Sequence, residues 1–237
     1  MTYQQKTKIS LGLKILVGSF ILMGLWATLG HYIGPRPPAE AFVNQLIPPG
    51  PEWFLQQLPR YDDLPITTFL HIVPAFLFFI LLGIQLIPSL RLIRPRLHRT
   101  TGRILILLAI TYGIAGLILG LLIPFGGELE IFTTIVVAIA FFFCLYRGLQ
   151  FARRRQFAPH RQWMLRMVAL SFAPLTMRLI MMPLGFIEFI DIQAVFGPLM
   201  IISSVINLMV LEMWILRDGK FLSRSTLTST KSGIGVR

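Results

Sequence analysis

The most constraining feature of this sequence is a basic stretch, RLIRPRLHRTTGR at residues 91–103, that separates two long apolar runs. The runs at about 65–87 and 104–123 each hold roughly 20 residues, the length that an α-helix needs to cross the hydrocarbon core of a bilayer. Strongly basic connections between membrane helices stay on the cytoplasmic side. The stretch therefore predicts two antiparallel membrane helices with a cytoplasmic connection.

The composition agrees with a membrane protein. Only 14% of the 237 residues are charged, whereas a soluble domain carries roughly a quarter. The formal net charge of +12 does not indicate nucleic-acid binding, because the basic residues fall between apolar runs instead of on one soluble module. The single cysteine, Cys144, lies inside an apolar run, which excludes an internal disulfide and cysteine-based metal spacing.

Six apolar runs predict an all-α integral membrane bundle of six transmembrane helices. We expect them at about 11–32, 65–87, 104–123, 131–146, 163–184 and 194–216. The first run follows Lys6 and Lys8 but is longer than a signal-peptide core and lacks a small-residue cleavage site, so we expect it to be retained. Helices two to five are expected to form the core, with the first and sixth packed outside.

The charge distribution predicts the orientation. If both termini are cytoplasmic, 19 of the 22 basic residues lie on the cytoplasmic side: Lys6, Lys8, Lys14, Arg91, Arg94, Arg96, Arg99, Arg103, Arg147, Arg153, Arg154, Arg155, Arg161, Arg166, Arg217, Lys220, Arg224, Lys231 and Arg237. Eight of the ten acidic residues then lie on the opposite side. The prediction is a multi-pass protein of the inner (cytoplasmic) membrane.

Three regions follow from this map. Residues 1–64 hold the first helix and an extracytoplasmic loop with seven prolines, which forbid a continuous helix there. Residues 65–216 form the membrane core with five helices. Residues 217–237 are basic and rich in Ser and Thr, and we expect an unstructured cytoplasmic tail.

Two His-Arg pairs repeat at corresponding places. His98-Arg99 opens the third helix and His160-Arg161 opens the fifth, which suggests two parallel copies of one helical hairpin. Three interpretations stay open. The arginines can serve only as topology signals; Arg99 and Arg161 can bind a lipid headgroup or another anion near helix N-termini; or His98 and His160 can be the axial ligands of a haem b.

A second candidate site lies near the other membrane surface. Counting along the helices places His71 about 10 Å and Arg178 about 8 Å below the outer surface, at similar depth. Arg178 either snorkels outward or pairs with Glu188 or Asp191, or it faces the bundle and binds an anionic group in a central cavity. His71 is either a hydrogen-bonded interior histidine or a ligand residue of the same cavity. Two further expectations concern contacts between helices. Glu212 should pair with Arg103 or Arg166, and Gly116-x3-Gly120 should let another helix approach closely.

These motifs resemble a known family. The runs Leu97-His98-Arg99, Gly102-Arg103 and His160-Arg161-x-Trp163-Met164, preceded by His71 and followed by Arg178, are similar over about 65–216 to the bacterial membrane proteins catalogued as domain of unknown function 2306. The resemblance implies a multi-pass helical bundle with His71, His98, Arg99, His160, Arg161 and Arg178 as its signature. It implies no settled activity.

A looser likeness is to di-haem b-type cytochromes, which hold haems between histidines on neighbouring helices. Those proteins need two histidine pairs, whereas His31 and His71 differ in depth by roughly 10 Å and leave only the inner pair. No phosphate loop, nucleophile elbow or dinucleotide fingerprint is present, so the sequence does not favour an enzyme. The main hypothesis is a ligand- or lipid-binding, transport-type bundle that takes a small molecule or a lipid. The alternative is a haem protein of electron transfer.

Overall fold

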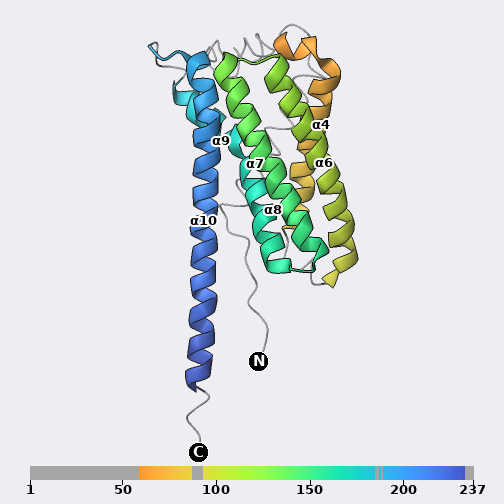
Figure 1. The fold of residues 1–237 in the computed structure, drawn as a ribbon, viewed down its shortest axis with the longest axis vertical. Helices are drawn as coiled ribbons and strands as arrows, with labels where there is room; N and C mark the ends of the chain where they lie inside the picture. The colour runs from red at the N-terminus through yellow and green to blue at the C-terminus, as the bar shows by residue number, and fades with distance from the viewer. Residues whose placement is uncertain (1–58, 87–92, 185–186, 188, 233–237) are drawn as a thin grey trace, which may run out of the picture.

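The structure, a computed structural model, describes residues 59–86, 93–184, 187 and 189–232 (Figure 1). The first expected helix and most of the proline-rich loop lie outside the described residues. Within them every regular element is helical: η1 (Pro59–Asp63), α4 (Pro65–Gln85), α6 (Pro95–Leu122), α7 (Gly127–Arg153), α8 (Phe157–Ser171), α9 (Ala173–Leu184) and α10 (Ile192–Ser232).

Five stretches of the described chain are long and apolar enough to cross a membrane: Pro65–Gln85, Pro95–Leu122, Gly127–Arg153, Phe157–Met181 and Ile192–Leu216. They coincide with the second to sixth expected helices. The protein is therefore a membrane protein with several apolar helices, which confirms the all-α membrane bundle at this level.

Helix α6 begins at Pro95, within the basic stretch and before the apolar run at 104–123. Proline suits this first position, because its fixed φ angle fits a helix and its missing N–H costs nothing there. His98, Arg99 and Arg103 therefore lie on the first turns of α6, as expected for a His-Arg pair that opens the third helix.

The C-terminal helix is also longer than expected. Figure 1 shows α10 extending beyond the ends of the other helices, and its helical backbone continues to Ser232. This differs from the unstructured tail expected from composition. Residues 220–232 contain neither proline nor glycine, so a helix that starts in the apolar segment can propagate through them one hydrogen bond at a time.

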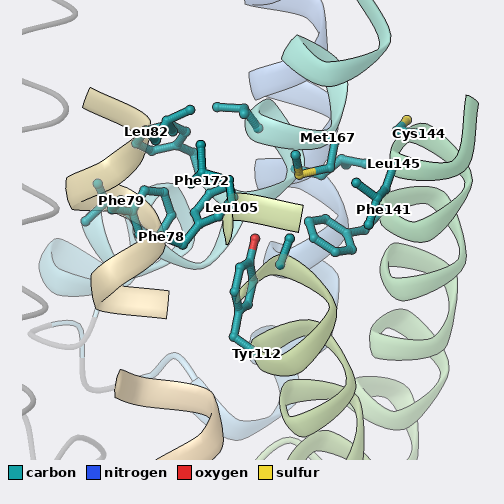
Figure 2. Close-up of a cluster of buried hydrophobic side chains, with 14 residues drawn as sticks. Phe78, Phe79, Leu82, Leu105, Tyr112, Phe141, Cys144, Leu145, Met167 and Phe172 are labelled. Atoms are coloured by element: carbon teal, nitrogen blue, oxygen red, sulfur yellow. The ribbon is translucent and has the colours of Figure 1, made fainter. Parts of the chain in front are cut away.

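The helices pack as two antiparallel hairpins, α4 with α6 and α7 with α8, and α10 lies against α7, α8 and α9. One cluster of buried side chains joins the hairpins: Phe78, Phe79, Leu82, Leu105, Ala109, Tyr112, Phe141, Cys144, Leu145, Met167, Val168, Leu170, Phe172 and Leu175 (Figure 2). All of them belong to the second to fifth expected helices. The expected core is present.

A second cluster changes the expected role of the sixth helix. It joins Met177 and Met181 of α9 to Ile192, Phe196 and Leu199 of α10, together with Phe125. Helix α10 also packs closely against α7 at Gly197, where an added Cβ would lie only 2.9 Å from the backbone nitrogen of Glu130. Helix α10 is thus part of the packed bundle near its start, not a covering helix outside it.

The bundle has two ends with different chemistry (Figure 1). We call one the His-Arg end, formed by the start of α6 and the α7–α8 turn. The other is the η1 end, formed by η1, the α6–α7 connection and the start of α10. The two His-Arg pairs therefore lie at the same end of the bundle, as a parallel hairpin repeat requires.

Candidate functional site

His71 is held between α4 and α6. Its Nδ1 lies 2.9 Å from the backbone oxygen of Tyr112, and its ring fills the space above Gly116. A Cβ at Gly116 would come within 2.7 Å of the ring, while one at Gly120 would come equally close to Thr134 of α7. The expected close approach at Gly116-x3-Gly120 is confirmed, and its first glycine makes room for a histidine.

Arg178 lies on α9 and is half-buried. Its Nη1 donates to the backbone oxygen of Pro174 at 3.1 Å, so the side chain folds back along its own helix toward the membrane interior. From there its positive charge acts on His71 of α4 and on Glu130 of α7. Arg178 and His71 thus lie within electrostatic range of each other, but each is hydrogen-bonded to a different backbone oxygen, and their shared ligand site stays a prediction.

Two acidic residues, Glu188 and Asp191, were expected as possible partners of Arg178. Asp191 accepts hydrogen bonds from the backbone N–H groups of Gln193 and Ala194, at 2.9 and 3.3 Å, and so caps the start of α10. Glu188 lies outside the described residues. Within the described part of the chain, Arg178 forms no ion pair.

Two charged residues at the η1 end were not predicted as site residues. Glu130 is half-buried and accepts a hydrogen bond from the Gly126 N–H at 2.6 Å. Arg60 donates to the Pro124 oxygen at 2.6 Å, lies 5.5 Å from the ring centroid of Phe125, and acts electrostatically on Glu130. A signal was available, because Glu130 directly precedes the fourth apolar run and Arg60 stands five residues before the second.

We call His71, Arg178, Glu130 and Arg60 the η1-end polar cluster. Its four members come from α4, α9, α7 and η1, and they are linked by electrostatic interactions that converge on Arg178 and Glu130. Two arginines lie within electrostatic range of one carboxylate. The Nδ1–H of His71 donates to the Tyr112 oxygen, so the other nitrogen of the neutral ring is an acceptor, and the N–H donors for a ligand come from the arginines. Such a set has an excess of positive charge and of N–H donors, which suits a negatively charged ligand.

A buried polar network lies deeper in the bundle. The hydroxyl groups of Tyr112 and Ser171 are 2.8 Å apart, and Figure 2 shows Tyr112 pointing into the core. Asn207 of α10 accepts from the Thr176 hydroxyl at 2.9 Å and donates to the Ala169 oxygen at 3.2 Å. Because the hydrogen bonds of this network stay within the protein, it ties α6, α8, α9 and α10 together.

At the His-Arg end each histidine is bound to the helix that precedes it. The Gln85 amide nitrogen lies 3.1 Å from the His98 backbone oxygen and 3.5 Å from its Nε2, and the Gln85 oxygen accepts from Thr101 at 2.7 Å. His160 places Nδ1 2.8 Å from the backbone oxygen of Gly148. The two hairpins thus use their histidines in the same way, as contacts to the preceding helix.

The arginines of this end differ in their surroundings. Arg166 forms a two-pronged ion pair with Glu212 at 2.6 and 3.1 Å, which confirms one of the two partners expected for Glu212. Its guanidinium also lies 4.8 Å from the ring centroid of Trp163. Arg161 is exposed and lies 5.4 Å from the Trp214 ring centroid, and Arg99 is exposed at the start of α6.

Comparison with known proteins identifies the family. The model of the family described as predicted membrane protein DUF2306 matches residues 68–215, well over half of the chain. The chain belongs to the DUF2306 family. The match covers α4 to the apolar part of α10, and so includes His71, both His-Arg pairs and Arg178. No curated protein and no solved structure matches the chain.

Proposed function

We propose that this DUF2306 protein is a ligand-binding membrane bundle of the transport type, and that the η1-end polar cluster binds an anionic amphiphile. The observation that carries this proposal is Arg178. An uncompensated arginine in a membrane helix costs about 2.5–3.5 kcal/mol at mid-membrane and less nearer the interface, where half-buried Arg178 is expected. In the described chain its guanidinium donates to one backbone oxygen, and His71 and Glu130 act on it only through longer-range electrostatics, so an anion would compensate its charge.

The surroundings of Arg178 favour a ligand with a hydrocarbon tail. Its neighbours Met177 and Met181 are buried in the second apolar cluster, whereas Leu179 is 57% exposed on a helix that crosses the membrane. The guanidinium therefore lies between an apolar interior and a surface that faces lipid. A lipid phosphate or a fatty carboxylate could reach it from the membrane with its tail still in the hydrocarbon.

The break in the fifth membrane helix supports a transport-type bundle over a purely structural one. In many transporters the substrate site is built around a discontinuous helix near the bilayer midplane. Here the fifth membrane helix has a one-residue break between α8 and α9, with helical hydrogen bonds on both sides of Phe172, and Arg178 lies six residues beyond it. The excess of positive charge in the cluster specifies the sign of the ligand.

The test measures ligand-induced stabilisation of the purified protein in an uncharged detergent. Dodecyl phosphate, laurate and inorganic phosphate distinguish a lipid phosphate, a fatty carboxylate and a free anion, and dodecyltrimethylammonium is the cationic control. A ligand at 100 times its Kd stabilises the native state by about 2.7 kcal/mol, which a thermal unfolding curve resolves. We expect this with an anionic amphiphile and not with the cationic one.

Variants locate the site. Arg178→Gln should abolish the stabilisation, while Arg153→Gln, which removes an exposed arginine at the end of α7, should keep it. Loss of stabilisation in Arg161→Gln with retention in Arg178→Gln would move the anion site to the His-Arg end. If both anionic amphiphiles leave the wild-type protein unaffected, the proposal is wrong.

Haem remains the second candidate function, and the two histidines fit it unequally. An axial histidine usually donates its second ring nitrogen to a carbonyl, and the Nδ1 of His160 has that partner in Gly148. His98 does not match, because its Nε2 lies beside the amide nitrogen of Gln85. An absorbance spectrum of the oxidised and reduced protein, expressed with ample haem, decides the matter: a Soret band that survives in His71→Ala but not in His160→Ala would favour haem at the His-Arg end.

A further inference from the structure

The fifth membrane helix is interrupted at Phe172. Pro174 has no N–H to donate to Leu170, and its ring crowds the preceding turn, so α8 ends at Ser171 and α9 begins at Ala173. The Phe172 N–H is shared between the oxygens of Val168 and Ala169, each at 3.2 Å. Phe172 is near the middle of the Phe157–Leu184 segment, so the break falls deep in the membrane.

Asn207 bridges this break from α10. Its amide nitrogen donates to the Ala169 oxygen of α8, and its amide oxygen accepts from the Thr176 hydroxyl of α9. The orientation of the amide follows from chemistry, since a backbone oxygen can only accept a hydrogen bond. One side chain therefore holds the last turn of α8 and the first turn of α9 at a fixed separation.

We propose that Asn207 is the positioning residue for Arg178; this rests on the proposed function of the η1-end polar cluster. Thr176, which Asn207 holds, stands two residues before Arg178 on the same short helix, and the Arg178 side chain folds back to Pro174. Without the bridge, the angle between α8 and α9 depends on the backbone at Phe172 and on the apolar packing of α9. A change in the angle of α9 would then carry the guanidinium away from His71.

A second polar side chain of α10, Ser204, forms its hydrogen bond differently from Asn207. Ser204 is buried one turn away, and its hydroxyl donates to the Met200 oxygen of its own helix at 2.8 Å. Ser204 thus bonds within its own helix, whereas the amide nitrogen and oxygen of Asn207 both bond to other helices. Ser204→Ala is consequently a matched control, because it removes a polar group from the same helix without touching the break.

The first measurement is geometric and does not depend on a ligand. In a Cys144→Ala background, spin labels at Leu179 of α9 and Phe132 of α7, both exposed, report the placement of α9. Labels at Gln162 of α8 and Ile139 of α7 report the other half of the span. We expect Asn207→Ala and Thr176→Val to broaden or shift the first distance distribution only, and Ser204→Ala to change neither.

The second measurement is the affinity for dodecyl phosphate and laurate. One hydrogen bond between membrane helices is typically weak, so Thr176→Val should weaken binding about threefold and Asn207→Ala roughly tenfold, with Ser204→Ala equal to wild type. An effect of Thr176→Val is decisive, because this variant keeps the Asn207–Ala169 bond and loses only the anchor of α9.

Several results would overturn the proposal. Unchanged α9 distances in Asn207→Ala would exclude a positioning role, and so would an equal change in the α8 pair, which indicates general loosening of the bundle. A shifted α9 with wild-type affinity would show that binding does not depend on its placement. If the wild-type protein binds neither probe, the proposed function fails, and the distance measurement alone then decides whether Asn207 fixes α9.

Discussion

Two partly buried arginines, Arg166 near the His-Arg end and Arg178 near the η1 end, have different partners. At the His-Arg end Arg166 has a carboxylate partner in Glu212 and an aromatic ring in Trp163, and Arg147 lies over the rings of Phe151 and Trp163. At the η1 end Arg178 bonds to a backbone oxygen and senses Glu130 and His71 only at longer range. Arg166 therefore has a carboxylate partner, whereas Arg178 has none among the described residues.

This difference separates structural charges from functional ones. A paired arginine with its charge and donors satisfied ties helices together, and α8 is joined to α10 in this way by Arg166 and Glu212. A charge that is half-buried in a membrane segment without a pair lowers stability, and polar groups of that kind are typically kept for ligands or ions. The predictions below probe that contrast.

The largest effect concerns which membrane side each end faces. Reporter fusions after Gly50 and after Arg155 place the two ends on opposite sides of the membrane, because basic connections stay cytoplasmic. We expect an all-or-none result, with activity of a cytoplasmic reporter after Arg155 and none after Gly50. A cytoplasmic signal after Gly50 would invert the orientation and contradict the predicted topology.

The next effect is steric and compares one glycine from each end. A Cβ at Gly197 would meet the backbone of Leu129 and Glu130 at 2.9–3.0 Å, and backbone cannot move aside cheaply. At Gly148 it would meet the side chain of Met164, which is flexible. Gly197→Ala should therefore reduce the free energy of unfolding by about 1–3 kcal/mol, and Gly148→Ala by clearly less. Thermal unfolding in detergent measures both, and equal losses would contradict the reasoning.

The third effect compares the two glutamates. Glu212→Gln breaks a partly exposed two-pronged ion pair, so we expect a loss of about 1 kcal/mol in stability and unchanged affinity for anionic probes. Glu130→Gln keeps an oxygen that can accept from the Gly126 N–H, so stability should change little. Removing its negative charge beside Arg178 and Arg60 should tighten binding of dodecyl phosphate or laurate. Weaker binding by Glu130→Gln would exclude an anion at this cluster.

Part of this contrast could be predicted from the sequence. Run lengths predicted the five membrane helices that the structure describes. Arg166 was expected as one of two partners for Glu212. These predictions depend on the length of a helix, its rise per residue and the pairing of opposite charges, all of which can be read from the sequence.

The break at Phe172 could not be predicted, although Pro174 was visible. Pro74 lies within α4 and Pro198 within α10 without ending either helix, so a proline alone does not say where a membrane helix stops. Pro174 differs from these prolines in its surroundings, because Asn207, from 38 residues away, donates to the Ala169 oxygen in the turn of α8 that precedes the break. A hydrogen bond between residues so far apart in the sequence depends on how the helices pack. The position of Glu130 likewise depends on the turn that precedes α7, where Gly127 has φ +65°.

The smallest effect tests whether the His-Arg end is structural throughout. Arg161 lies 5.4 Å from the Trp214 ring centroid, and both side chains are exposed. A cation–π contact at an exposed site is worth about 0.5–1 kcal/mol, so Arg161→Ala should lower stability by roughly 0.5 kcal/mol and Arg161→Lys by less. Because this contact only joins α8 to α10, neither variant should alter the affinity for dodecyl phosphate. A fall in that affinity with unchanged stability would instead mean that Arg161 holds an anion, and the two ends of the bundle would then share one function.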